Sequence, residues 1–153
     1  MISQRAWRLL AVVAASSLAI AGCTAGGDSG GGATTVAVTL QEWAVVPATD
    51  SAPAGDITFD VTNEGPDDIH EFVVIRTDLD PADLPTDADG VVDEEGEGME
   101  VLDEIEDIPV GESQSVTVPL DAGSYVLVCN IWSADEGEAH YMMGMRTAFT
   151  VTE

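Results

Sequence analysis

Six short stretches of the chain carry the residue pattern of β-strands, and this pattern limits the fold more than any other feature. Each stretch alternates polar and apolar residues or is rich in β-branched residues, and turn-forming Gly, Pro, Asn or Asp residues bound it. No stretch shows the periodicity of an amphipathic helix. The predicted strands are 35–40, 57–62, 69–77, 114–119, 125–131 and 147–152.

Strands that are half polar must bury their apolar faces against a second layer. Six or more such strands separated by turn residues predict an all-β domain, an antiparallel two-sheet sandwich. In the penultimate strand Tyr125, Leu127 and Cys129 should share one face, and Val126 and Val128 the other. Cys129 therefore stands at the end of this strand.

Residues that bind metals follow the end of that strand. Cys129 is followed by His140 and then by Met145. Thiolate and thioether ligands favour Cu(I), and two imidazoles with one thiolate and a weak axial Met form a blue-copper site. The only other histidine of the chain, His70, begins a second apolar strand behind the turn-like segment 63–66. These residues predict a site for one copper ion.

The chain resembles the cupredoxins, the family of plastocyanin and azurin, over about residues 36–151. The residues that carry the resemblance are Gly123-x-Tyr125-x-x-x-Cys129, then His140-x4-Met145, with His70 after an Asn-x-Gly turn. The resemblance implies a Greek-key, cupredoxin-like sandwich. It also implies a copper ion held by His70, Cys129 and His140, with Met145 as the axial ligand.

Two positions differ from the usual cupredoxin pattern. Plastocyanin-like and azurin-like members have a short segment between the Cys and His ligands, whereas ten residues separate Cys129 from His140 here. Many members also carry Asn after the first His ligand, and this chain has Glu71. The differences concern the loop geometry and the hydrogen bonding around the sulfur.

Three methionines follow His140, and each spacing could return a thioether to the metal: Met142, Met143 and Met145. We favour Met145 because Gly144, just before it, can adopt backbone conformations closed to other residues. Such a residue suits a tight turn at the metal.

Residues 1–22 read as an export signal, because two arginines precede an apolar run and no acidic residue is present. The run is shorter than the roughly 20 residues that span a bilayer. It ends in Ile20-Ala-Gly-Cys23, which resembles the lipobox of bacterial lipoproteins. We expect cleavage before Cys23 and diacylation of this cysteine, which suffices for stable anchoring. The alternative is an ordinary secreted protein with a disulfide between Cys23 and Cys129.

Lipidation of Cys23 would leave Cys129 as one free thiol in an oxidising compartment, where a metal would protect it. The alternative for Cys129 taken alone is an inert core cysteine. Residues 23–33 are small and Gly-rich, so we expect the lipidated Cys23 and a flexible tether. Residues 34–153 then form a single domain.

Residues 78–107 contain fourteen acidic residues in thirty and show the least regular pattern. We expect a long acidic excursion from the sandwich. A standard EF-hand loop is excluded, because aligning Gly90 with its sixth position puts Pro85 first and Gly96 twelfth. A solvated acidic surface is the favoured interpretation, with weak cation binding as the alternative.

The charge of the chain limits its partners. The formal net charge is −25, and cleavage before Cys23 would make it −27, since both N-terminal arginines leave and there is no lysine. Nucleic-acid binding is excluded because it requires basic residues. The field favours cationic redox partners, such as a basic cytochrome, or a membrane oxidoreductase. The alternative is adaptation to salt or solubility alone. We expect a monomer.

Two histidines are too few for the additional catalytic coppers of oxidases and nitrite reductases, so we expect no enzyme. A thiol enzyme would need an electropositive site, and a zinc enzyme would leave Met145 without a role. The resemblance to the cupredoxins implies a carrier of single electrons, and the predicted lipid anchor would place it at the outer face of the membrane. The alternatives are a protein for copper storage, scavenging or delivery, and a metal-free structural sandwich.

Overall fold

The structure, a computed structural model, describes residues 33–153, and nearly all of its regular structure is strand. Each of the six predicted segments forms a strand, namely β1, β4, β5, β7, β8 and β11. The predicted export signal and Cys23 lie outside the described residues. The elements are β1 Thr34–Gln41, β2 Ala44–Pro47, β3 Ser51–Pro53, β4 Gly55–Asn63, β5 His70–Thr77, β6 Met99–Ile108, β7 Ser113–Leu120, β8 Gly123–Val128, β9 Trp132–Ser133, β10 Glu138–Ala139, α1 His140–Met143 and β11 Arg146–Thr152.

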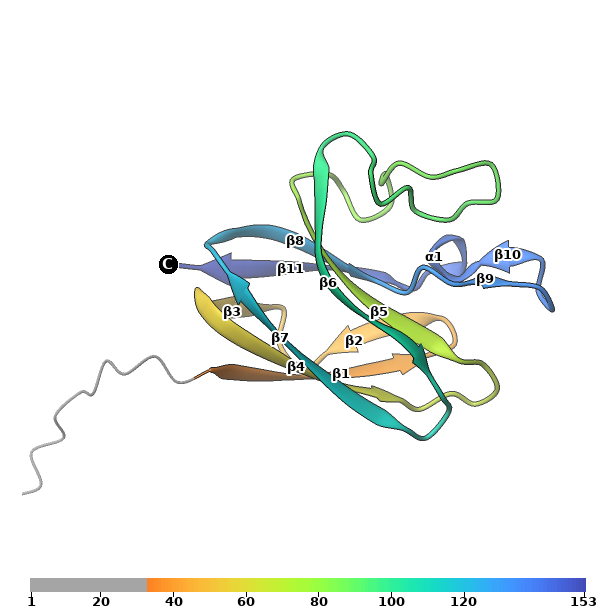
Figure 1. Ribbon diagram of the computed structural model, residues 1–153, viewed down its shortest axis with the longest axis horizontal. Helices are drawn as coiled ribbons and strands as arrows, with labels where there is room; N and C mark the ends of the chain where they lie inside the picture. Colours follow the sequence, from red (N-terminus) through yellow and green to blue (C-terminus); the bar gives the residue numbers. More distant parts are fainter. Residues whose placement is uncertain (1–32) are drawn as a thin grey trace, which may run out of the picture.

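Two sheets pack face to face and confirm the predicted all-β sandwich (Figure 1). One sheet has the order β2-β1-β4-β7, and the other β3-β11-β8-β5-β6. The core between them is apolar and includes three phenylalanines. The ring of Phe59 lies 5.3 Å from that of Phe72 and 5.6 Å from that of Phe149, measured between centroids.

Two of the strand pairs are parallel, which the prediction of an antiparallel sandwich did not include. β1 pairs with β4, and β3 with β11, in the parallel sense, whereas all other described pairs are antiparallel. Parallel neighbours need a crossover connection. Here β3 supplies it, because the chain leaves the first sheet after β2, joins the second as β3 and returns as β4.

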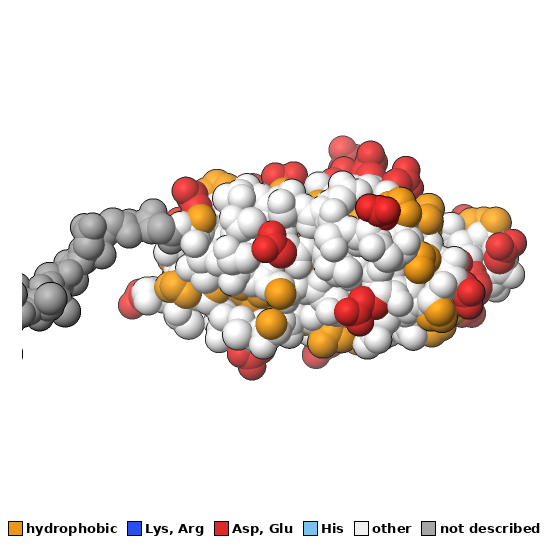
Figure 2. All heavy atoms as spheres, turned by 90° about the horizontal axis from the view of Figure 1, so that it is seen from below, with side chains coloured by type: hydrophobic (Ala, Val, Ile, Leu, Met, Phe, Trp, Pro, Cys, Tyr) orange, Lys and Arg blue, Asp and Glu red, His pale blue; other side chains and the backbone are white. Residues whose placement is uncertain are grey.

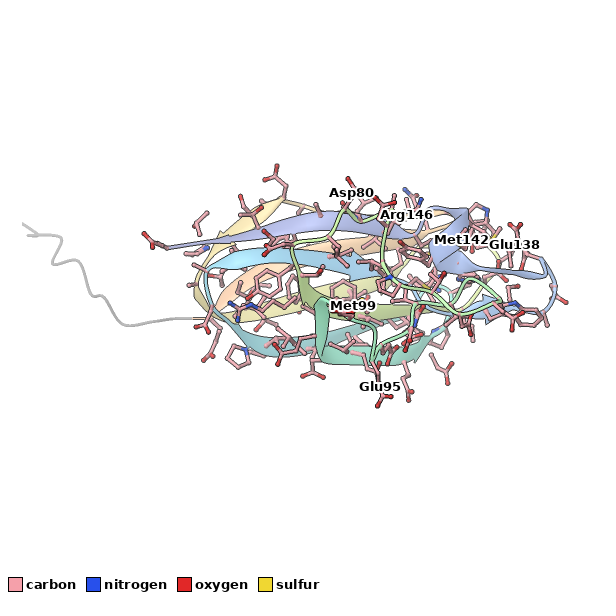
Figure 3. The ribbon with its side chains drawn as sticks, turned by 90° about the horizontal axis from the view of Figure 1, so that it is seen from above. Asp80, Glu95, Met99, Glu138, Met142 and Arg146 are labelled. Atoms are coloured by element: carbon pink, nitrogen blue, oxygen red, sulfur yellow. The ribbon has the colours of Figure 1, made fainter. Side chains whose placement is uncertain are left out.

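A second, smaller core covers the outer face of the five-stranded sheet. Residues 78–98 cross over this face (Figure 3), and Leu84 and Val92 pack there with Val126 and Val128 of β8. Tyr125, Leu127 and Cys129 instead enter the core between the sheets. The two faces of β8 therefore divide as its alternation predicts, and both are buried.

The predicted acidic excursion ends earlier than expected. Residues 78–98 are mostly irregular, but residues 99–107 belong to the edge strand β6, which pairs with β5 through two register shifts. The acidic residues of β6 do not alternate regularly with apolar ones, so its sequence lacks the pattern of a strand. Charged residues on an edge strand discourage pairing with other chains.

The elements that carry the candidate ligands meet at one end of the sandwich. The start of β5, α1 and the β9–β10 hairpin lie there, while the start of β1 and the C-terminus lie at the opposite end (Figure 1). Among residues 33–153, no helix has the length and apolar character that crossing a membrane requires.

Candidate metal centre

His70 is the first residue of β5, and the turn before it is tightly fixed. The side chain of Asn63 donates hydrogen bonds to the carbonyl oxygens of Asp68 at 2.8 Å and Ile108 at 2.9 Å. It also accepts one from the N–H of Gly65 at 2.8 Å, and Gly65 has a φ of 53°. The predicted Asn-x-Gly turn thus places His70, which is fully buried, at the entrance of the strand.

Cys129 follows β8 directly and is fully buried. Its N–H donates a hydrogen bond to the carbonyl of Met145 at 3.0 Å. Burial raises the pKa of its thiol to about 12, although the N–H groups of Glu71 and Ile131 act in the opposite direction. The thiol alone is therefore protonated and poorly nucleophilic at neutral pH, whereas a bound metal cation would deprotonate it.

The long segment between Cys129 and His140 folds back on itself. β9 and β10 form a short antiparallel hairpin, and the N–H of His140 donates to the carbonyl of Ile131 at 2.8 Å. His140 then opens the single helical turn α1. The ten intervening residues therefore form a closed hairpin, so the chain still returns His140 beside Cys129.

The three predicted strong ligands converge on one point. The Nδ1 atoms of His70 and His140 lie 3.2 Å apart, and they lie 3.9 Å and 3.4 Å from the Sγ of Cys129. A point equidistant from three atoms at these separations lies about 2 Å from each, which is the length of a bond between a transition metal and nitrogen. The donor set and its spacing fit a metal in trigonal coordination.

Both imidazoles suit metal binding because they are neutral at neutral pH. Burial lowers the pKa of His70, and the neighbouring His140 lowers it further against the influence of Glu42 and Asp68. Burial likewise lowers the pKa of His140. The outward Nε2 atom of each ring is buried and has no hydrogen-bond partner among the described residues.

Of the three candidate methionines, Met145 alone is fully buried. Its N–H donates to the carbonyl of His140 at 3.0 Å. Met142 is 56% exposed, and Figure 3 shows it near the surface of α1, while Met143 is partly buried. Gly144 has a φ of 124°, which permits the turn before Met145.

Two residues of the β1–β2 turn, which the sequence did not single out, lie against the centre. The ring of Trp43 packs edge-on at 4.9 Å from His140 and 6.4 Å from His70. Glu42 Oε1 lies 3.5 Å from the Nε2 of His70. Burial raises the pKa of the Glu42 carboxyl, but backbone N–H bonds from Asp68 and Asp67 lower it, and the net shift is downward. Both residues lie far from the ligands in the sequence, and no motif links them to the ligands.

Two further residues fasten the 78–98 segment to the ligand region. The hydroxyl of Tyr141 accepts a hydrogen bond from the N–H of Leu84 at 3.1 Å and donates one to the carbonyl of Pro81 at 2.8 Å. The side chain of Asn130 bonds both backbone groups of Val92, at 2.7 and 3.1 Å. The neighbours of Cys129 and His140 in sequence thus hold the acidic segment in place.

No family model and no curated protein matches the chain, but solved structures do. Reduced auracyanin from Roseiflexus castenholzii is 22% identical, with a TM-score of 0.56 over 80% of this chain and 100% of that one. Auracyanin B is 25% identical, with a TM-score of 0.55 over 79% and 90%. Auracyanin A, a "blue" copper protein from Chloroflexus aurantiacus, is 18% identical, with a TM-score of 0.53 over 79% and 100%.

These neighbours are cupredoxins. Their matches cover 79–80% of this chain. In fold and in the arrangement of its strands, the chain is a cupredoxin-like protein.

Proposed function

We propose that this chain is a type 1 copper protein that transfers single electrons. The observation that carries the proposal is the triangle of His70 Nδ1, His140 Nδ1 and Cys129 Sγ. Two imidazoles and a thiolate form the trigonal ligand set of blue-copper sites, and the buried Met145 offers the weak axial thioether. The description of auracyanin A as a "blue" copper protein supports the same reading. Bound copper would supply the one-electron couple Cu(II)/Cu(I).

The protein holds its ligands still and excludes water from them. Backbone hydrogen bonds fix Cys129 to Met145 and His140 to Ile131, and a backbone N–H donates to the sulfur. The side chains of His70 and Cys129 are fully buried, and His140 is 1% exposed. Because the ligands cannot move far when the charge of the site changes, reorganisation is small and electron transfer is fast.

The same burial supports an electron carrier over a protein for copper storage, scavenging or delivery. Exchange of metal with a carrier requires ligands that a second protein or chelator can reach. We expect the copper-loaded full chain to keep its metal through repeated redox cycles in the presence of a chelator. Rapid loss to the chelator would favour the alternative.

We propose that electrons leave by the edge of His140. A surface pocket beside this residue is lined by Ile69, Ile131 and Trp132, and the side chains of Ile69 and Trp132 are 47% and 45% exposed. Met142 is also exposed, whereas Tyr141 is buried in the second core. An apolar surface of this kind suits a short-lived contact with a redox protein.

The charge around the patch supports a cationic partner such as a basic cytochrome. Asp68 and Asp135 line the same pocket. On the face in Figure 2, acidic side chains are scattered and no Lys or Arg of the described residues is visible. The rate of electron transfer to a basic cytochrome should therefore fall as ionic strength rises. A rate that is independent of salt would count against this partner class.

We also propose export and anchoring by a lipid on Cys23. The start of β1 lies at the end of the sandwich opposite the metal centre (Figure 1), so a tether there would leave the centre facing away from the membrane. Wild-type protein should partition with membranes and carry acyl chains, while Cys23→Ala should not mature by this route. An intact segment 1–22, or a disulfide between Cys23 and Cys129, would contradict the proposal.

The visible spectrum tests the main proposal directly. The purified full chain, after addition of Cu(II) and removal of excess metal, should hold one copper and show an intense thiolate-to-Cu(II) charge-transfer band. Cys129→Ala and His140→Ala should lose the band. A colourless protein that binds zinc in preference to copper would overturn the proposal.

A further inference from the structure

Both histidines point Nδ1 toward the candidate metal centre. Metal binding through Nδ1 limits which protonation state the other ring nitrogen, Nε2, can have. Nδ1 of His70 lies 3.9 Å from the Sγ of Cys129, and Nδ1 of His140 lies 3.4 Å from it. A neutral imidazole carries one proton, so Nδ1 can bind a metal only if the proton is on Nε2. A metal-binding histidine usually donates that N–H to an acceptor, which fixes its tautomer.

For His70 the structure offers one such acceptor among the described residues. Its Nε2 is fully buried and lies 3.5 Å from Oε1 of Glu42. This separation is somewhat longer than a hydrogen bond. However, Oε2 of Glu42 is buried and also has no hydrogen-bond partner. A buried donor and a buried acceptor that both lack a partner thus belong to neighbouring side chains.

The Glu42 carboxylate is held at this place by the backbone. Oε1 accepts hydrogen bonds from the N–H groups of Asp67 at 3.2 Å and Asp68 at 2.9 Å. These bonds join the β1–β2 turn to the turn that precedes β5. The side chain of Glu42 is only 10% exposed. The carboxylate is therefore an ordered part of the wall behind His70.

We propose that Glu42 is a positioning residue, whose carboxylate accepts the Nε2–H of His70, keeps Nδ1 of His70 free for the metal, and favours Cu(II) over Cu(I). The inference rests on the proposed copper site. Because Glu42 carries a negative charge behind a ligand, it stabilises the higher charge of the oxidised ion more than that of the reduced ion.

His140 has no such carboxylate partner at its Nε2 within residues 33–153, so the inference applies to His70 alone. Among the described residues, Nε2 of His140 has neither a hydrogen-bond partner nor an ion-pair partner. The two Nδ1 atoms lie 3.2 Å apart, so in the metal-free protein a proton on one of them can be donated to the other. If Glu42 holds the His70 proton on Nε2, then His140 carries its proton on Nδ1 and donates it to His70.

The first test measures the copper-loaded full chain of Glu42→Gln. This variant keeps an oxygen that can accept the bonds from Asp67 and Asp68, but it removes the charge. We expect the preference for Cu(II) over Cu(I) to fall about tenfold, which raises a one-electron potential by 59 mV. Glu64→Gln is the matched control, because Glu64 is exposed and its substitution removes the same charge from the neighbouring turn. Equal shifts in the two variants, or no shift in either, would overturn the role of Glu42.

The second test needs no copper, so its outcome is separate from that of the proposed function. Nitrogen-15 spectra of the metal-free full chain should show His70 protonated at Nε2 and His140 at Nδ1. In Glu42→Leu the preference should be lost and both rings should populate mixed tautomers, while Glu64→Gln should match the wild type. A wild-type His70 with its proton on Nδ1, or tautomers unchanged in Glu42→Leu, would overturn the inference. Wild-type tautomers as expected in a chain that binds no copper would refute the proposed function alone.

Discussion

The backbone N–H of Glu71 donates a hydrogen bond to the Sγ of Cys129 across 3.2 Å. The bond joins the residue after the first histidine of the site to the cysteine at the end of β8, so it couples two strands at the metal centre. A donor to a sulfur favours its thiolate form. Because the donor belongs to the backbone, replacing the Glu71 side chain leaves it in place.

The side chain of Glu71 makes the stability of the protein depend on pH. Burial, followed by the charges of Glu104 and Glu94, raises the pKa of its carboxyl from an ordinary 4.5 to about 7. Between these two values the folded state holds a proton that the unfolded chain releases, so the stability falls as pH rises from 4.5 to 7. Below pH 4.5 both states are protonated and the effect vanishes.

Glu71→Gln should therefore stabilise the metal-free full chain above pH 7 and change little below pH 4.5. The side chain is partly accessible to solvent, and screening reduces the gain to on the order of 1 kcal/mol. Urea unfolding at pH 4.5 and pH 8 measures the difference. Glu97→Gln, at an exposed position, is the control. A gain of the same size at both pH values would show that the change acts through packing and not through ionisation.

Met145→Gln should keep copper bound, alter the visible spectrum and lower the reduction potential. The axial thioether tunes the potential while the two imidazoles and the thiolate secure the metal. Met142→Gln is the matched control, because Met142 lies on the adjoining turn with its side chain 56% exposed. Voltammetry of both variants decides the assignment. A shift in Met142→Gln or in Met143→Gln with none in Met145→Gln would show that the loop closes on a different methionine.

Gly144→Ala should weaken copper binding and cost about 1–3 kcal/mol of stability, because its φ of 124° is strained for residues with a Cβ. An added Cβ would also lie 3.2 Å from the carbonyl oxygen of Trp43, which packs against His140. Gly111→Ala is the control, with a φ of 81° and no atom within 4 Å of the added Cβ. Both variants should lose stability on thermal unfolding, but only Gly144→Ala should lose copper in a competition titration. Equal copper affinities of the two variants would show that the turn at Gly144 does not affect copper binding.

Tyr141→Phe should loosen the 78–98 segment over the second core. The N–H of Leu84 and the carbonyl of Pro81 lose their shared partner, at a cost of about 1–3 kcal/mol. Tyr125→Phe removes a comparable bond, from its hydroxyl to the carbonyl of Asp121 at 2.7 Å, outside this segment. Both should lower the urea midpoint, but hydrogen exchange at Leu84 should accelerate only in Tyr141→Phe. Unchanged exchange at Leu84 would mean that the other contacts hold the segment.

The sequence by itself determined the local features of this protein. Alternation of side chains located six strands, and it divided β8 into a face that points between the sheets and a face under the 78–98 segment. Cys129, His140 and His70 indicated a single copper site, because a thiolate together with imidazoles is a ligand set that suits copper. Such patterns are readable because each depends on neighbours along the chain.

Tertiary structure decided the features that depend on distant segments. The edge strand β6 forms by pairing with β5, and its acidic residues gave no strand pattern of their own. The parallel pair of β1 and β4 depends on β3 joining the opposite sheet. Glu42 reaches His70, 28 positions further along the chain, only because the turn before β5 folds against the β1–β2 turn. The wall around the metal centre is assembled by contacts between turns, and no spacing within any one segment encodes them.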